Sequence, residues 1–191
     1  MAAMNTRHSQ RQNGTSMIEV LVTIVILLVG LLGLAGLQAR LQTSEMESYQ
    51  RAQALILLND MASRLATNRN FATDYVTTAA DPIGVDIADC GALPETSTAE
   101  TDRKEWCDAL QGASETSGGS NVGVMVGGRG CVEDLGSSQF MITVAWQGLA
   151  PISAPPASVA CGQDFYDTAG TNCIDDLCRR VVTTIVRIAA L

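Results

Sequence analysis

The sequence predicts an α+β fold, in which a long N-terminal α-helix packs on a small antiparallel β-sheet. The first observation is an uncharged, mostly apolar run, Val20–Leu37, which a stripe of helical period extends to Leu65. The second is that alternating and β-branched segments gather after residue 121. Because the strands follow the helix instead of alternating with it, we expect helix and sheet to be segregated.

The run Val20–Leu37 is long enough to cross a membrane. Its 18 residues contain no charged side chain, and as a helix they span roughly 27 Å, close to the hydrocarbon thickness of a bilayer. Arg7 and Arg11 precede it, so the positive-inside rule places residues 1–14 in the cytoplasm. The rest of the chain then lies on the outer side of that membrane.

Three interpretations fit such a run. A secretory signal peptide would be cut after it, where Ala35–Ala39 supplies only a weak cleavage site of small residues. A plain signal anchor would keep both the leader and the run. In the third, the leader is cut off before the run, which stays on the mature chain. Glu19 distinguishes them, because an acid at the mouth of a membrane span is costly and the first two gain nothing from it.

The residues around Glu19 carry a resemblance to a known family. In the stretch GTSMIE, residues 14–19, the acid is the fifth residue after Gly14. This resembles the leader motif of type IV prepilins. The resemblance implies cleavage between Gly14 and Thr15 by the prepilin peptidase of the bacterial inner membrane, followed by N-methylation of Thr15. Many family members begin the mature chain with Phe, and Thr15 departs from that pattern.

The chemistry of these residues supports the resemblance. A glycine leaves room for a peptidase at the scissile bond. Once helices are packed together, Glu19 needs a cation, and the N-terminal ammonium of a neighbouring subunit is the nearest candidate. Gly30, Gly33 and Gly36 allow helices to approach closely but also weaken the helix, so helix packing and a functional hinge both stay open.

The run also resembles, more narrowly, the PilV-type minor pilins of type IVa pili. The shared part runs from Gly30 to Gln38, and the proline that major pilins usually carry late in this span is absent. The resemblance implies a pilin-like architecture: a leader at 1–14, a transmembrane and assembly half of the helix at 15–38, an amphipathic half at 39–66, and a globular head at 67–191. The head would lie in the periplasm before assembly and on the pilus afterwards.

Beyond Gln38 the helical pattern continues as an amphipathic stripe. Its apolar members are Ala54, Leu58, Met61, Ala62 and Leu65, with polar residues such as Gln50, Arg51, Asn59, Asp60 and Arg64 between them. We expect one helix from about Thr15 to about Thr67, whose second half packs on the head.

The head begins with a polar segment and ends with strands. We expect a long loop over residues 67–121, with a short helix at Asp102–Leu110 and an end at Gly118–Gly119. Strands are expected at Val122–Val126, Gln139–Gln147 and Arg179–Ala189, with a turn at Gly127–Gly130 and a second loop that begins near Pro151. The turn lacks the spacing of a phosphate-binding loop. The sheet should have three or four strands.

The amino-acid composition argues against several classes of function, among them histidine-dependent catalysis and nucleic-acid binding. The only histidine, His8, lies in the leader, so the mature chain has none for Ser-His-Asp catalysis or for Cys/His zinc sites. Cleavage after Gly14 removes two of 12 basic residues and none of 20 acidic ones, which gives a net charge of −10. That balance argues against nucleic acid as a partner. We expect no enzyme activity, no cofactor and no metal.

Six cysteines indicate an oxidising compartment. All follow the membrane span, and their number is even: Cys90, Cys107, Cys131, Cys161, Cys173 and Cys178. Six cysteines allow 15 connectivities, and the sequence alone does not choose among them. Cys90 and Cys107 lie in the same long loop and could form a local bridge; if they do, Cys131 pairs with Cys161, Cys173 or Cys178. A four-thiolate zinc site is the less favoured alternative, because it needs short C-x2–4-C knuckles and the sequence offers one at best, formed by Cys173 and Cys178.

The resemblance implies a structural function. A minor pilin helps to initiate type IV pili, at or near the tip, with other minor pilins, major pilins and a tip-associated adhesin as partners. Twitching motility and cell adhesion would depend on it indirectly. The alternative is a type II secretion pseudopilin, whose leader and helix would look nearly identical. A receptor- or DNA-binding head on the same scaffold also stays open.

Overall fold

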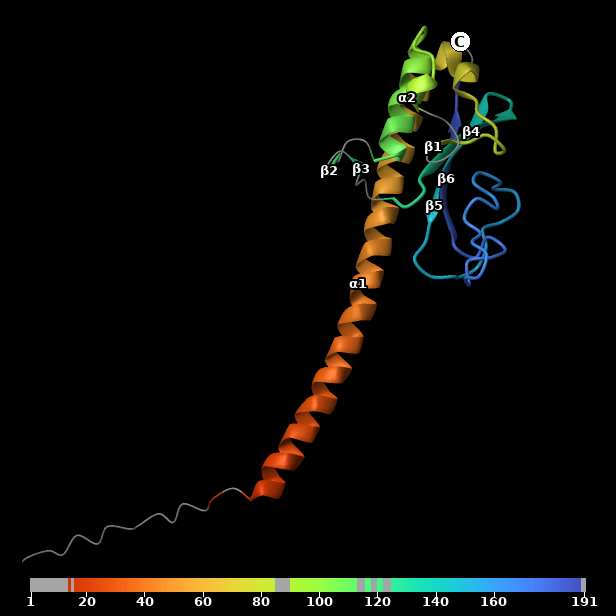
Figure 1. Cartoon of the computed structure of the whole chain (residues 1–191). Helices are drawn as coiled ribbons and strands as arrows, with labels where there is room; N and C mark the ends of the chain where they lie inside the picture. The colour runs from red at the N-terminus through yellow and green to blue at the C-terminus, as the bar shows by residue number, and fades with distance from the viewer. Residues whose placement is uncertain are drawn as a thin grey trace, which may run out of the picture. The chain divides into compact units, whose positions relative to one another are not determined.

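A computed structural model of the chain describes Gly14 and residues 16–84, 90–112, 116–117, 120–121 and 125–189. The chain divides into two compact units, Met1–Gln42 and Thr43–Leu191. Helix α1 runs through both and spans Met17–Thr67 (Figure 1). The other elements all belong to the second unit, which also contains α1 from Thr43 onward and is called the head from here on. They are η1 (Arg69–Tyr75), β1 (Ile83–Gly84), η2 (Cys90–Ala92), α2 (Thr98–Leu110), β2 (Thr116–Ser117), β3 (Ser120–Asn121), β4 (Arg129–Gly136), β5 (Gln139–Gln147) and β6 (Arg179–Arg187).

The head contains a four-stranded antiparallel sheet with the strand order β1-β4-β5-β6. Strands β4, β5 and β6 form its body, and β5 pairs with β6 over nine residues without interruption. The short strands β2 and β3 form a separate antiparallel pair. This long helix with a small antiparallel sheet confirms the predicted α+β fold.

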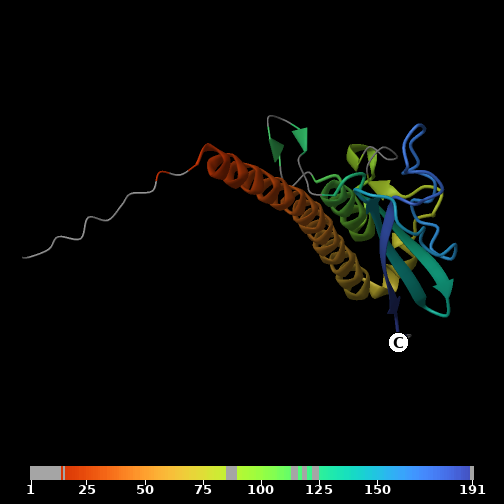
Figure 2. The ribbon, with the colours of Figure 1, turned by 90° about the horizontal axis from the view of Figure 1, so that it is seen from below.

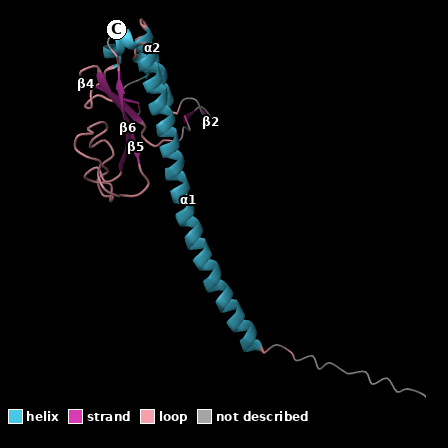
Figure 3. Ribbon diagram, turned by 180° about the vertical axis from the view of Figure 1, so that it is seen from behind, coloured by secondary structure: helices cyan, strands magenta, loops and turns pink. Residues whose placement is uncertain are grey.

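Helices cover one face of the sheet. The part of α1 within the head buries Ala54, Leu58, Met61 and Leu65, the stripe that the sequence predicts. Helix α2 adds Trp106 and Leu110, and the sheet contributes Val132 of β4 and alternate residues of β5 to the same core. Figure 3 shows both helices on one side of β4, β5 and β6, with the loops that precede β6 on the other side.

Gln50 departs from the prediction. The sequence places it among the polar residues between the stripe, yet only 1% of its surface is exposed. It lies one helical turn before Ala54, so its position places it on the buried face although its side chain is polar. Its side-chain oxygen has no hydrogen-bond partner among the described residues.

Helix α2 begins earlier than the sequence suggests. The predicted start at Asp102 is wrong by four residues, because Ser97 caps the helix and α2 begins at Thr98. The Ser97 hydroxyl accepts a hydrogen bond from the Glu100 amide, and the Glu100 carboxylate accepts one from the Ser97 amide. The segment predicted as a long loop therefore holds η1, β1, η2, α2 and the β2–β3 pair.

Strand β4 was missed, and the predicted turn at Gly127–Gly130 is partly wrong. Gly127 lies in a turn, but Arg129 and Gly130 begin β4. The predicted strand at 122–126 is not present in its described part, where residues 125 and 126 form a bend and a turn; residues 122–124 and the glycine pair at 118–119 lie outside the described residues.

The structure confirms the other two predicted strands, one of them with a different end. Strand β5 has the predicted limits Gln139–Gln147, and β6 begins at the predicted Arg179 but ends at Arg187 instead of Ala189. Residues 148–178 contain no helix or strand, which confirms the predicted second loop around Pro151, Pro155 and Pro156. The view from below in Figure 2 shows this loop, in blue, beside the strands.

Candidate functional site: the N-terminal segment and its head

The N-terminal segment places its one acid at the start of the helix. Helix α1 begins at Met17, and the backbone amides of Glu19 and Val20 donate hydrogen bonds to the Ser16 carbonyl, at 2.9 and 3.3 Å. Glu19 therefore lies in the first turn, where the helix dipole favours a negative charge. Among the described residues, the Glu19 carboxylate has no hydrogen-bond or ion-pair partner. Thr15, the predicted first residue of the mature chain, lies outside the described residues.

The apolar half of α1 has no core of its own among the described residues. Every side chain from Met17 to Met46 is exposed, and the exposed fractions of Leu21, Ile26 and Leu32 are 62%, 65% and 72%. In the part of the chain that the structure describes, α1 is the one helix long and apolar enough to cross a membrane. Burial of these side chains requires a bilayer or other molecules.

The three glycines of this half lie in uninterrupted helix. A β-carbon added at Gly30, Gly33 or Gly36 would meet no described atom within 4 Å. Among the described residues, nothing therefore requires glycine at these positions. Because each lacks a side chain, the helix backbone is open to close approach by a neighbouring molecule there.

Three disulfides tie the head together. Cys90–Cys107 links η2 to α2, Cys131–Cys161 links β4 to the loop on the outer face of the sheet, and Cys173–Cys178 closes a short loop before β6. The sequence left three partners open for Cys131, and the structure selects Cys161. Because all six sulfur atoms are paired, none serves as a zinc thiolate. Within the described residues, no cluster of acidic residues or cysteines could hold a metal ion.

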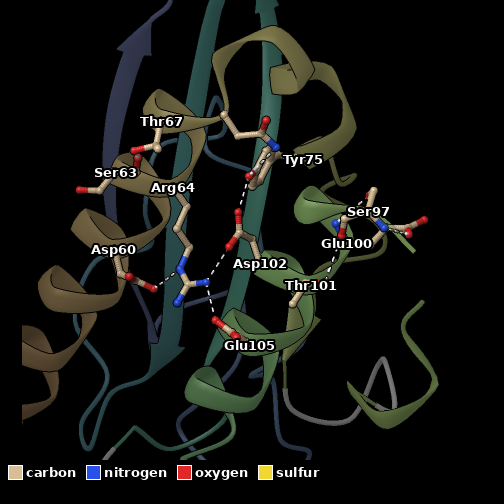
Figure 4. A network of polar contacts seen from close by, with 11 residues as sticks. Asp60, Ser63, Arg64, Thr67, Tyr75, Ser97, Glu100, Thr101, Asp102 and Glu105 are labelled. Atoms are coloured by element: carbon tan, nitrogen blue, oxygen red, sulfur yellow. Dashed lines mark hydrogen bonds and ion pairs between the residues drawn. The ribbon is translucent and has the colours of Figure 1, made fainter. Parts of the chain in front are cut away.

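A polar network links the two helices of the head (Figure 4). Arg64 of α1 makes ion pairs with Asp60, Asp102 and Glu105 at 2.9, 2.8 and 2.6 Å. The Tyr75 hydroxyl donates a hydrogen bond to the other oxygen of Asp102. One guanidinium thus holds together a carboxylate of its own helix and two of α2. The sequence placed Arg64 only among the polar residues between the apolar stripe, because two of its three partners are distant in the chain.

The network shifts two pKa values. Burial works to lower the pKa of Arg64, but its hydrogen bonds to Glu105 and Asp102 and the charge of Asp60 outweigh it, so the pKa is raised. Burial and the hydrogen bond to Asp102 raise the pKa of Tyr75 to about 12. Both groups therefore keep their protons across the physiological range. The network links α1 to α2 and to η1 through these contacts.

The glycine-rich segment before β4 serves packing. A β-carbon at Gly128 would lie 2.5 Å from the Leu110 carbonyl oxygen. Arg129 is 4% exposed and lies over the rings of Phe165 and Tyr166, 4.9 and 4.8 Å from their centres. Burial raises the pKa of Tyr166 to about 12, although Arg129 opposes this rise. Arg129 is therefore buried against aromatic rings instead of standing exposed in the turn.

Comparison with known protein families identifies the N-terminal segment. Residues 9–35 match the family model described as the prokaryotic N-terminal methylation motif. This match includes Gly14, Thr15 and Glu19, and it indicates a type IV pilin-like prepilin. Proteins with this motif are structural rather than catalytic. Comparisons with curated proteins and with solved structures gave no match.

The motif gives the exposed half of α1 a physical meaning. A prepilin is membrane-anchored by its N-terminal helix and then packs that helix against those of other pilins in a pilus or pseudopilus. The exposed apolar side chains of this half are consistent with both environments, a membrane and a bundle of helices. The match ends at residue 35, so it says nothing about the head, which makes up most of the chain.

Proposed function

We propose that this chain is a minor pilin of a type IV pilus, of the PilV type, which helps to initiate the filament at or near its tip. The observation that carries the proposal is the spacing of Gly14 and Glu19 before an apolar helix with no core of its own. The glycine-rich continuation to Gln38, without proline, favours a minor over a major subunit. Prepilin peptidase, other minor and major pilins and a tip-associated adhesin are the proposed partners.

In the proposed mechanism the helix enters a bundle of pilin helices. Glu19 pairs there with the N-terminal ammonium of a neighbouring subunit, because a charge buried without a partner would be strongly destabilising. The pair also fixes the register, since a subunit displaced along the bundle leaves both charges unpaired. Gly30, Gly33 and Gly36 allow the neighbouring backbone to come close. The head stays in the periplasm until assembly and then lies on the pilus.

The mass of the mature N-terminus tests the class. We expect the chain purified from membranes to begin with N-methylated Thr15, which requires cleavage after Gly14. A terminus near Gln38 or Ala39 would mean secretory cleavage, and an intact leader would mean a plain anchor. Either result would exclude the prepilin interpretation.

Glu19→Ala tests the assembly step. We expect this variant to be cleaved and to stay in the membrane but to enter pili poorly, as measured by the amount of the chain in sheared pili. Glu45→Ala is the matched control, since Glu45 is an exposed acid on the same helix outside the apolar half. Normal incorporation of Glu19→Ala would contradict the mechanism.

Gene deletion separates the minor pilin from the pseudopilin. Loss of twitching and surface pili with normal protein secretion supports the minor pilin. Loss of secretion with normal twitching supports the type II secretion pseudopilin, which the methylation motif fits equally well.

A further inference from the structure

The two edges of the four-stranded sheet differ. On the β4 side, β1 pairs with Arg129 and Gly130. Beyond β1, Thr77 continues the cover: its amide donates to the Val132 carbonyl at 2.8 Å, and its hydroxyl accepts from the Val132 amide at 2.9 Å. An irregularity of register between Asp134 and Gly136 then interrupts β4. This edge is covered and bent in the ways that protect natural sheets from further strand pairing.

The other edge is strand β6, and its hydrogen-bond pattern can be derived from the register. Two bonds flank the pairing with β5: the Ile188 amide donates to the Ser138 carbonyl at 2.8 Å, and the Gly148 amide donates to the Cys178 carbonyl at 2.7 Å. Hydrogen-bonded pairs alternate along an antiparallel ladder, so the even-numbered residues of β6 bond to β5. The amides and carbonyls of the odd-numbered residues point to the free edge.

Four successive odd-numbered residues leave the edge open: Val181, Thr183, Ile185 and Arg187. Among the described residues, none of their backbone groups on that side has a partner. The start of β6 is different, because the Arg179 amide bonds to Asp176 and the Arg180 side chain bonds to the Ala150 carbonyl. The open stretch therefore begins at Val181 and continues to the end of the strand.

The open edge lacks the usual protection. Between Val181 and Arg187 there is no proline, glycine, bulge or lysine, and β-branched residues fill the stretch. The side chains of these odd-numbered residues lie on the outer face of the sheet, where Ile185 is 57% exposed and Thr183 and Arg187 are exposed. A long, regular, aliphatic edge of this kind is a template for another strand.

We propose that the free edge of β6 is a docking site for one extended segment of a partner subunit, which adds to the sheet antiparallel to β6. Backbone groups repeated at every second residue are matched only by another extended backbone. The segment carries an aliphatic side chain opposite Ile185 and a carboxylate beside Arg187. Charge complementarity supports the carboxylate, since Arg187 is an exposed cation with no ion-pair partner among the described residues, at the end of the open edge.

A second copy of the chain fits this edge poorly. Strand β6 and the part of α1 within the head run in the same direction (Figure 1). Antiparallel pairing of two β6 strands would therefore place the Thr43 ends of the two heads at opposite ends of the pair. Two copies anchored through these ends in one membrane cannot adopt that arrangement, so the strand comes from a different subunit. The assignment of the strand to a different subunit rests on the proposed function, whereas the open edge itself does not.

Amide hydrogen exchange on the purified full-length chain in detergent tests the site. The probe is the peptide acetyl-Glu-Thr-Val-Thr-Val-Thr-Val-amide, whose Glu lies opposite Arg187 and whose first and second Val lie opposite Ile185 and Thr183. We expect the amides of the odd-numbered residues to exchange fast in the free chain and about tenfold slower with saturating peptide. The amides of Val182, Thr184 and Val186 should be slow in both. The same peptide, N-methylated at its Glu and Val residues, should have no effect.

Three results would overturn the proposal. Slow exchange at the odd-numbered amides of the dilute free chain would show that the edge is already covered. Protection that rises with protein concentration alone would assign the edge to a second copy. Equal protection by the peptide and its N-methylated form, or none by either, would exclude backbone pairing.

Substitution of Thr183 carries the test into cells. Thr183→Pro removes an amide that the fold does not use, at an edge position where proline is tolerated. Thr183→Ala keeps the amide and is the matched control. We expect the proline variant alone to lose peptide protection and to enter pili poorly. Equal incorporation of the two variants would contradict the proposal whatever the result with Glu19→Ala, which tests the proposed function separately. If the amides of Val182 and Thr184 exchange fast in the proline variant, that variant is misfolded and its incorporation says nothing about the edge. The comparison between the peptide and its N-methylated form on the unsubstituted chain then decides whether the proposal holds.

Discussion

Gly130→Ala should destabilise the head strongly, because the space beside this glycine is filled. A β-carbon there would overlap Cζ3 and Cη2 of Trp106 and would lie 2.8 Å from Cδ1 of Leu110. Carbon atoms prefer about 3.5–4.0 Å, so these neighbours must move. They have little freedom, since Trp106 is fully buried and its ring nitrogen donates to the Leu57 carbonyl at 2.9 Å.

The magnitude follows from the cost of overpacking. Extra methyl groups in a well-packed core cost about 1–3 kcal/mol, and the fixed position of Trp106 places this case near about 3 kcal/mol. For a domain of this size that corresponds to a melting temperature lower by roughly 6–12 °C. Thermal unfolding of the full-length chain in detergent, followed by near-ultraviolet circular dichroism with the disulfides intact, measures it.

A double-mutant cycle isolates the contact. Trp106→Phe removes the distal ring atoms that the new methyl group would strike, so Gly130→Ala should cost less than half as much in that background. Additive effects of the two substitutions, or a cost of less than about 1 kcal/mol for Gly130→Ala alone, would refute the reasoning.

Three further substitutions test other links in the head. Tyr75→Phe removes the hydroxyl that donates to Asp102 and should lower the free energy of unfolding by about 2 kcal/mol in urea titrations; an unchanged value would show that the network contributes nothing. Replacing both Cys90 and Cys107 by alanine should cost about 3 kcal/mol, measured in the same way, and a loss below about 1 kcal/mol would contradict the assigned bridge. Burial raises the pKa of Glu133, so the folded state holds this proton more tightly than the unfolded state and loses stability as the pH rises through that interval. Glu133→Gln should therefore raise the melting temperature at pH 7 but not at about pH 3.5, below the ordinary range of the group, and an equal change at both values would contradict this.

The elements that could be predicted are those with a strong period. The apolar stripe of α1 and the alternation of β5 are signals within one element, and both limits of β5 came out right. Strand β4 could not be found in this way. Its start, Arg129 and Gly130, contains turn-forming glycine, but the structure uses Gly130 for the room that Trp106 needs. Trp106 requires this space only once α2 has packed on the sheet, so no local sequence pattern predicts it.

The processing site and the head site depended on different information. Gly14 and Glu19 are five residues apart and precede an apolar run, so the sequence alone shows their spacing. The partners of Arg64 and the choice of Cys161 for Cys131 depend on contacts distant in the chain. The edge of β6 is open because no further strand pairs with it among the described residues. The residues of β6 themselves do not show whether a neighbouring strand is present.

The two unsatisfied surfaces of the chain differ in what they can select. Apolar side chains and one carboxylate on the N-terminal helix are met by any helix of similar character with a free ammonium group, so this half permits entry into a filament without choosing the neighbour. The edge of β6 demands an extended backbone in one register, and Arg187 adds a charge requirement. On the proposed function, incorporation therefore depends on Glu19 and the choice of partner depends on the head. Exchanging the head between two minor pilins should move partner choice with the head, whereas exchanging residues 15–38 should leave it unchanged.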